Sequence, residues 1–151
     1  MYGFTLNTDI LMIASGTSDK ADDGGNCFSL LTWMMDTVNA RLVLDDTQKI
    51  SAEYGRKMKA ECLGRAFVAK MMKDDKIERV ARASGDSWKR ARLQLKLHTE
   101  DQDFVRAAMA SRDKLLVAEE ADFHRRRAAL KAHAEVLLHS AEEAVELTKA
   151  A

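Results

Sequence analysis

The sequence predicts an α/β fold in which helices cover a mainly parallel sheet. Short β-prone runs alternate with stretches of helical spacing along most of the chain, which is typical of strand–helix–strand units. The 151 residues are enough for one domain with a substantial core and too few for two domains of ordinary size. Proline is absent, so glycine and polar clusters mark the element boundaries. We therefore expect a single domain over residues 1–151.

The composition excludes several classes of protein. Hydrophobic residues make up 46% of the chain and charged residues 32%, as in soluble globular proteins. Lys plus Arg and Asp plus Glu both number 24, so the net charge does not indicate a nucleic-acid binder, although a local basic patch stays open. Cys27 and Cys62 are too few for a disulfide framework or a structural zinc site, which favours a reducing compartment.

The sequence also contains no apolar run of membrane-spanning length and no signal-peptide pattern at its start. We therefore expect a cytoplasmic protein that does not contact a membrane.

Five runs are predicted to be strands: residues 2–6, 41–44, 92–97, 114–118 and 135–139. The third is included because Leu93, Leu95 and Leu97 alternate with polar neighbours, as in a half-buried strand.

Helices are expected where apolar residues recur every three or four positions, and loops where Gly, Ser and Asp gather. The expected helices are residues 27–40, 50–58, 64–80, 100–111 and 121–132 and a closing helix capped by Ser140. The expected loops are residues 15–26 and 81–87.

The helix at residues 100–111 carries the first acidic candidate. Asp101 shares the apolar stripe of this helix, since Phe104, Val105 and Ala108 follow it by three, four and seven residues. Asp103 points elsewhere, so Asp101 is the preferred candidate. The alternative is that Asp101 only caps the helix.

Further acidic and amide groups fall where predicted strands end or helices follow them. They are Asn7 and Asp9, Glu53, and Glu119, Glu120 and Asp122. Ligands collect beyond the carboxyl ends of parallel strands, and clustered carboxylates favour a cation such as Mg²⁺ or Mn²⁺, which prefers oxygen ligands. Such an ion can activate water for phosphodiester hydrolysis. The alternatives are an ordinary acidic turn after the strand and, for Glu53, a surface ion pair with Lys49 or Lys57.

The chain resembles the PIN-domain family in four segments that occur in the family's order. Residues 6–11 (LNTDIL) resemble a strand end followed by an Asp-Thr-Asn-like motif, and residues 53–54 resemble a Glu-Tyr pair in the helix after the second strand. Residues 101–108 reproduce an acid followed by an apolar residue and an alanine at family spacing. Residues 117–123 (VAEEADF) resemble the family's segment after the fourth strand.

This resemblance implies a three-layer α/β/α, PIN-like fold with four or five strands. It implies an endoribonuclease that hydrolyses RNA with Mg²⁺ or Mn²⁺, in a toxin–antitoxin or defence setting. Its partners would be RNA, an antitoxin or another protein, and a second copy of the chain. By resemblance Glu53, Asp101 and Glu120 would be catalytic. The metal-binding candidates are Asn7, Asp9, Glu53, Asp101, Asp103, Glu120 and Asp122.

Three positions depart from the family pattern. Asn7 stands where the first acid is expected, Ala118 replaces a hydroxyl residue, and Glu120 stands where Asp is common. These changes leave open a catalytically degenerate domain that binds RNA or a protein. They also leave open a plain α/β protein whose acids are capping residues, in which Glu53, Asp101 and Glu120 would not converge.

Two basic clusters are candidates for contact with a phosphate backbone. Their candidate residues are Lys89, Arg90, Arg92 and Arg125. The alternative for each cluster is an ordinary solvated face.

Overall fold

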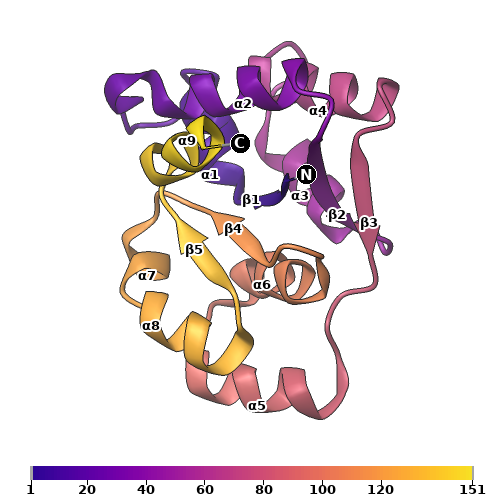
Figure 1. The fold of residues 1–151 in the computed structure, drawn as a ribbon, viewed down its shortest axis with the longest axis vertical. Coiled ribbons are helices and arrows are strands. Elements are labelled where there is room, and N and C mark those ends of the chain that lie inside the picture. The colour runs from indigo at the N-terminus through magenta and orange to yellow at the C-terminus, as the bar shows by residue number, and fades with distance from the viewer. Residues whose placement is uncertain (1, 151) are drawn as a thin grey trace.

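A five-stranded, all-parallel sheet forms the middle layer of the protein, which a computed structural model describes over residues 2–150 (Figure 1). The strands are β1 (Tyr2–Leu6), β2 (Ala40–Asp45), β3 (Ile77–Val80), β4 (Leu115–Val117) and β5 (Leu137–His139). Their order across the sheet is β3-β2-β1-β4-β5. The α/β class, the mainly parallel sheet and its four or five strands are therefore confirmed, and the sheet is wholly parallel.

Helices cover both faces of this sheet, which completes a three-layer α/β/α arrangement. The longer helices are α1 (Thr8–Ala14), α2 (Asn26–Asp36), α3 (Lys49–Lys57), α4 (Leu63–Lys73), α5 (Gly85–Leu95), α6 (Thr99–Ala110) and α9 (Ala141–Lys149). Short helical turns are η1 (Asp23–Gly25), α7 (Ala121–His124), α8 (Arg127–Ala129) and the π-helix η2 (Leu130–Ala134). Figure 1 shows α2, α4 and α9 on one side of the sheet and α6 on the other.

The central strands are apolar because helices bury them from both sides. Leu6 and Leu42 are fully buried, and so are Leu116 and Val117 in β4. β1 pairs with β2 on one side and with β4 on the other. The end of β1 therefore lies in the middle of the sheet, with the end of β4 directly beside it.

The predicted strand at residues 92–97 is wrong, because these residues continue helix α5. Trp88, Ala91 and Leu95 are buried at helical spacing, whereas the side chain of Leu93 is 70% exposed. The alternation of leucines was therefore coincidental, and one stripe of the helix carries the burial. The predicted loop at residues 81–87 is correspondingly too long, since α5 begins at Gly85.

The predicted helix at residues 64–80 is also wrong in its last part. Helix α4 ends at Lys73, a turn follows in which Asp75 has a positive φ of 56°, and Ile77–Val80 forms β3. β3 is an edge strand in which Val80 is the one buried residue. Such a strand shows no apolar periodicity, so the pattern of the preceding helix obscured it.

The closing helix begins as predicted, at Ser140. The Ser140 hydroxyl accepts the N–H of Glu143, and the Glu143 carboxylate accepts the N–H of Ser140, which forms a reciprocal capping box. None of the helices described is both long and apolar enough to cross a membrane.

Candidate metal-binding edge

The candidate site lies where β1 and β4 end side by side. The N–H of Asn7 donates to the carbonyl of Val117 at 2.9 Å, which continues the pairing of the two strands by one residue. Helix α1 then begins at Thr8, and the turn with Glu119 and Glu120 follows β4. Two segments that are more than 100 residues apart in the sequence are thereby held at one edge of the sheet.

Asp9 connects these two segments. Its Oδ2 accepts the N–H groups of Glu119 and Glu120, both at 2.9 Å. Its Oδ1 is buried and accepts no hydrogen bond from any residue that the structure describes. Burial raises the pKa of Asp9 from 3.8 to about 6, and the charge of Glu120 acts in the same direction. The N–H groups of Glu119 and Glu120 and the nearby side chain of Asn7 offset only part of the rise.

Glu53 reaches the same edge from helix α3. Its side chain is only 12% exposed. Oε2 accepts the hydroxyl of Thr8 at 2.7 Å, and Oε1 lies 3.2 Å from the guanidinium of Arg56. The next residue, Tyr54, is buried and donates its hydroxyl to the carbonyl of Leu6. Glu53 is therefore positioned in two ways: Thr8 at the start of α1 holds it directly, and Leu6 at the end of β1 holds the neighbouring Tyr54.

Asp101 comes from the first turn of α6. The N-cap position of α6 is His98, and no side chain caps this helix, so the capping interpretation of Asp101 is not observed. Burial raises the pKa of Asp101 to about 6, and the negative charges of Glu120 and Glu53 add to the rise. We call Asp9, Glu53, Asp101 and Glu120 the acidic edge, because the charge of Glu120 acts on both Asp9 and Asp101 and the charge of Glu53 acts on Asp101.

The acidic edge does not form a ready-made ligand set. Within residues 2–150, no three His, Cys, Asp or Glu side chains are placed so that they share a metal ion. Asn7 is buried at the N-cap of α1, beside the acidic edge, and its neutral amide adds no charge to it. The oxygens of the four carboxylates, which include the buried Oδ1 of Asp9, are nevertheless the donor types that Mg²⁺ and Mn²⁺ prefer.

Three other acids in the region have separate partners. Asp103 pairs with Arg82, and Asp122 pairs with Arg125 within α7 and its end. The Glu119 carboxylate accepts the N–H of Ala141 at 2.8 Å, which links the end of β4 to the start of α9. The structure therefore favours Glu120 over Asp122 as the member of the acidic edge from this turn, a choice that the sequence left open.

Arg82 also contacts an acid at the end of β2. Its Nε lies 3.8 Å from Asp45, which is fully buried. Burial alone would raise the pKa of Asp45, but the hydroxyl of Thr47 and the N–H groups of Ile50 and Lys49 together hold it below its usual value. We call Asp45, Arg82 and Asp103 the Arg82 cluster; nothing in the sequence pattern indicated it.

A cleft of about 370 Å³ opens beside Glu53, between α3 and the start of α6. Lys49, Arg56 and Glu100 line it together with Glu53. Arg56 lies 4.0 Å from Glu100, and Lys57 lies 3.3 Å from Glu100, so ion pairs bridge the two helices. Glu53 therefore forms its ion pair with Arg56, and not with Lys49 or Lys57, the two partners that the sequence suggested for a surface ion pair. The helical spacing of three residues between Glu53 and Arg56 is the signal that could have indicated it.

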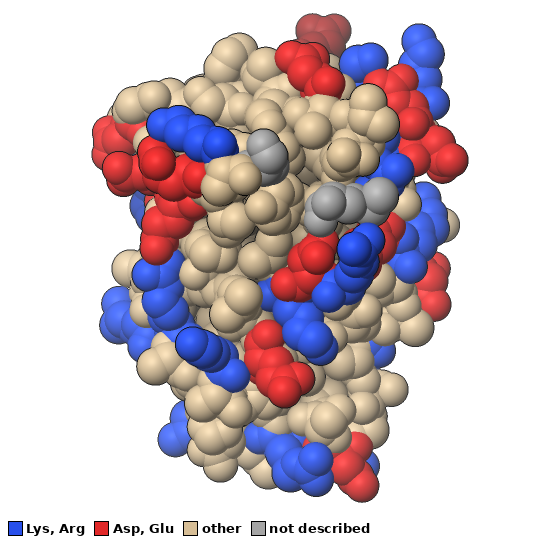
Figure 2. Space-filling model, in the orientation of Figure 1, with Lys and Arg blue, Asp and Glu red and all other residues tan. Residues whose placement is uncertain are grey.

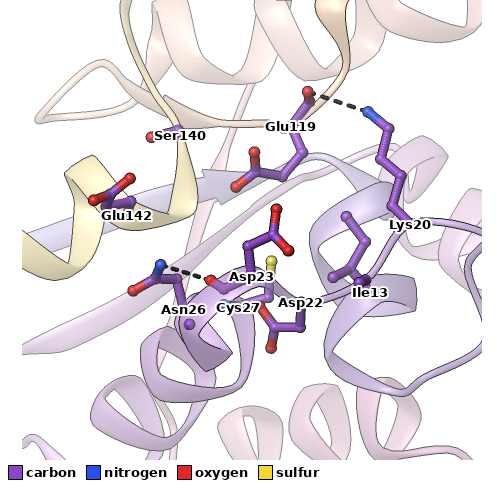
Figure 3. A pocket seen from close by; sticks show the side chains of 11 residues that line it. Ile13, Lys20, Asp22, Asp23, Asn26, Cys27, Glu119, Ser140 and Glu142 are labelled. Atoms are coloured by element: carbon purple, nitrogen blue, oxygen red, sulfur yellow. Dashed lines mark hydrogen bonds between the residues drawn. The ribbon is translucent and has the colours of Figure 1, made fainter.

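A larger hollow of about 610 Å³ lies near Glu119, between η1, the start of α2 and the start of α9. Figure 3 shows the side chains of Asp22, Asp23, Glu119 and Glu142 around it. Asp22 accepts the N–H groups of Cys27 and Phe28 at the start of α2, and Glu119 does the same for α9, so both acids complete helix ends. The Cys27 thiol is not a nucleophile at neutral pH, because burial raises its pKa far above its usual value.

The predicted phosphate-contact residues lie on two other elements. Lys89, Arg90 and Arg92 are exposed on α5, and Arg125 is exposed after α7. In Figure 2 basic side chains gather over α7 and α8, and acidic ones gather above them over the start of α2 and α9.

In comparisons with protein-family models, with curated proteins and with solved structures, no match to this chain is found.

Proposed function

We propose that the protein is a PIN-like, metal-dependent endoribonuclease whose site is the acidic edge. The observation that carries this proposal is the accumulation of negative charge from four separate segments at the carboxyl ends of parallel strands. The pKa values of Asp9 and Asp101 are both raised to about 6. Uncompensated carboxylates of this kind are costly, and a divalent cation would remove the cost.

The residues of the acidic edge fit Mg²⁺ or Mn²⁺ in their chemistry. Glu53, Asp101 and Glu120 would hold the ion, with Asp9 and the amide oxygen of Asn7 beside them. Because no three described side chains are placed to share an ion, binding requires the carboxylates to rotate towards it. When bound, the ion supplies a water of lowered pKa and stabilises the charge that develops on the phosphate.

The remaining chemistry belongs to the chain itself. Thr8 holds one oxygen of Glu53, and the anchoring of Tyr54 to Leu6 fixes the turn of α3 that carries Glu53. The cleft between α3 and α6 gives an extended substrate a path past Glu53, the acidic-edge residue in its lining. Lys49 and Arg56 line this path and attract phosphates.

The test measures cleavage of single-stranded RNA by the full chain with Mn²⁺ and with EDTA. We expect cleavage with Mn²⁺ only, and a loss of about 100-fold or more in Asp101→Asn, since a preorganised charge at a reacting centre is worth that much. Asp122→Asn is the matched control, because Asp122 already pairs with Arg125. Cleavage in EDTA, or equal cleavage by Asp101→Asn and the wild type, would contradict the proposal.

A second candidate is a degenerate domain of this kind that binds RNA without cutting it. It is favoured by Asn7, a neutral and buried residue at the place of the family's first acid. In this case the same experiment gives RNA binding without metal-dependent cleavage. The variant Asn7→Asp then tests whether the missing charge is the reason.

A further inference from the structure

Arg56 occupies a distinctive position among the basic residues of the cleft. Its guanidinium lies 3.2 Å from Oε1 of Glu53 and 4.0 Å from Glu100, so it bridges the acidic edge and the mouth of the cleft. The Arg56 side chain is 63% exposed, whereas the side chain of Glu53 is 12% exposed. An exposed cation on the solvent side therefore compensates the largely buried charge of Glu53.

Both oxygens of Glu53 are engaged in this arrangement. The hydroxyl of Thr8 holds Oε2 from inside, and Arg56 holds Oε1 from the solvent side. Thr8 is buried in the first turn of α1, so its contact with Glu53 is shielded from water. The Arg56 contact is an exposed pair within one helix, and such pairs contribute little free energy and open readily. A second cation that approaches Glu53 competes with Arg56 and not with Thr8.

We propose that Arg56 exchanges partners during substrate binding, leaving Glu53 for the metal ion and binding a phosphate of the RNA strand. This inference rests on the proposed function of the acidic edge. A guanidinium suits this role because its planar set of donors matches carboxylate and phosphate oxygens alike. Lys57 is the neighbouring cation on α3, but its 3.3 Å contact is to Glu100 and not to Glu53.

If Arg56 exchanges partners, removal of its charge should change the affinities for Mn²⁺ and for a nucleic-acid strand in opposite directions. Removal of the Arg56 charge should tighten binding of Mn²⁺ alone by about two- to fivefold, because an exposed competing ion pair is worth no more than this. The same change should weaken binding of a non-cleavable single-stranded oligonucleotide by about three- to tenfold when Mn²⁺ is present, because the ion then occupies Glu53 and Arg56 is available to a phosphate. It should also lower the salt dependence of RNA binding by about one phosphate contact.

The experiment compares wild type, Arg56→Gln and Lys149→Gln. Calorimetric titration measures Mn²⁺ binding, and fluorescence anisotropy measures binding of the same non-cleavable single-stranded oligonucleotide with Mn²⁺ present. Lys149 forms an exposed pair with Glu146 at the same spacing of three residues, so Lys149→Gln changes the net charge identically at a different place. Lys57→Gln, a near neighbour that does not touch Glu53, should not tighten Mn²⁺ binding beyond the control.

Opposite shifts in Arg56→Gln alone support the exchange. If Arg56→Gln and Lys149→Gln behave alike while the wild type binds Mn²⁺, the exchange is wrong and the proposed metal site stands. If the wild type binds no Mn²⁺, the proposed function fails and the exchange fails with it.

Discussion

At the end of β2 a buried carboxylate lies beside a guanidinium, whereas near the ends of β1 and β4 the carboxylates are subject to one another's negative charge. In the Arg82 cluster, Asp45 also receives several hydrogen bonds, and its pKa is lowered. In the acidic edge, the pKa values of Asp9 and Asp101 are raised to about 6. Both groups lie at the same edge of one sheet, so the fold does not require uncompensated charge there.

This difference separates a structural use of acids from a binding use. Arg82 fixes the segment after β3 to α6 and to β2, and Asp103 is thereby engaged in structure. Among residues 2–150, the acidic edge is opposed by the exposed Arg56 at Glu53 and by the charge of His98 at Asp101, and the pKa of Asp101 is raised nevertheless. Sites that bind cations need charge that is positioned but not neutralised, and perturbed pKa values often mark them.

The largest effect is expected from removing the cation of the Arg82 cluster. Arg82→Ala should lower the free energy of unfolding by about 3 kcal/mol, because it leaves the buried charge of Asp45 without a counter-ion. Urea denaturation measures this change. Arg56→Ala removes an exposed pair and should cost less than about 1 kcal/mol. If Arg82→Ala and Arg56→Ala lost equal free energy of unfolding, the Arg82 cluster and the acidic edge would not differ in their structural role.

An intermediate effect, of opposite sign, is expected from removing a charge of the acidic edge. The folded state binds the proton of Asp101 more tightly than the unfolded state does, so its titration contributes stability below about pH 4 that is lost as the pH rises through about 6. Asp101→Asn should therefore raise the free energy of unfolding by about 1.5 kcal/mol above about pH 7, after allowance for solvent screening. Near pH 4 the two proteins should be almost equal.

Thermal unfolding of Asp101→Asn and wild type across this pH range, in EDTA, measures the effect. A variant that is less stable than wild type at neutral pH would show that Asp101 is a structural acid, like those of the Arg82 cluster. Saturating Mn²⁺ should stabilise the wild type and not the variant, if the cation binds where we propose.

The smallest effect is expected at Thr8, which positions Glu53. Thr8→Val keeps the shape of the side chain but removes the donor to Glu53, and should cost about 1 kcal/mol. Thr8→Ser keeps the hydroxyl and should restore Mn²⁺ affinity to near the wild-type value. Chemical denaturation and metal titration on both variants measure this. Equal Mn²⁺ affinity in Thr8→Val and Thr8→Ser would mean that the hydroxyl does not position Glu53.

Much of the fold was accessible from local patterns. The strands that lie in the middle of the sheet are continuous apolar runs, and the closing helix carries a complete capping box. β3 was not accessible, because an edge strand with Val80 as its one buried residue has no periodic signal. Residues 92–97 misled because a helix stripe and a strand alternation share Leu95.

The candidate site divides in the same way. The position of Asp101 on the buried side of α6 followed from helical spacing, and that of Asn7 followed from the strand pattern before it, whereas Asp9 lies in the first turn of α1. The sequence could not show that Asp9 spans the gap to the N–H groups after β4, or that Glu53 is held by Thr8. These contacts join residues 45 or more positions apart, which no local pattern encodes.

By itself the sequence determined the parallel α/β class and the set of acids that strand ends and helix starts present to one edge, because burial periodicity is a local property of each element. The tertiary structure alone decided which acids are neutralised. Asp103 and Asp122 pair with arginines, whereas Asp9 and Asp101 are both subject to the negative charge of Glu120. Charge compensation depends on distances between elements, and those distances are set only when the sheet and its helices pack.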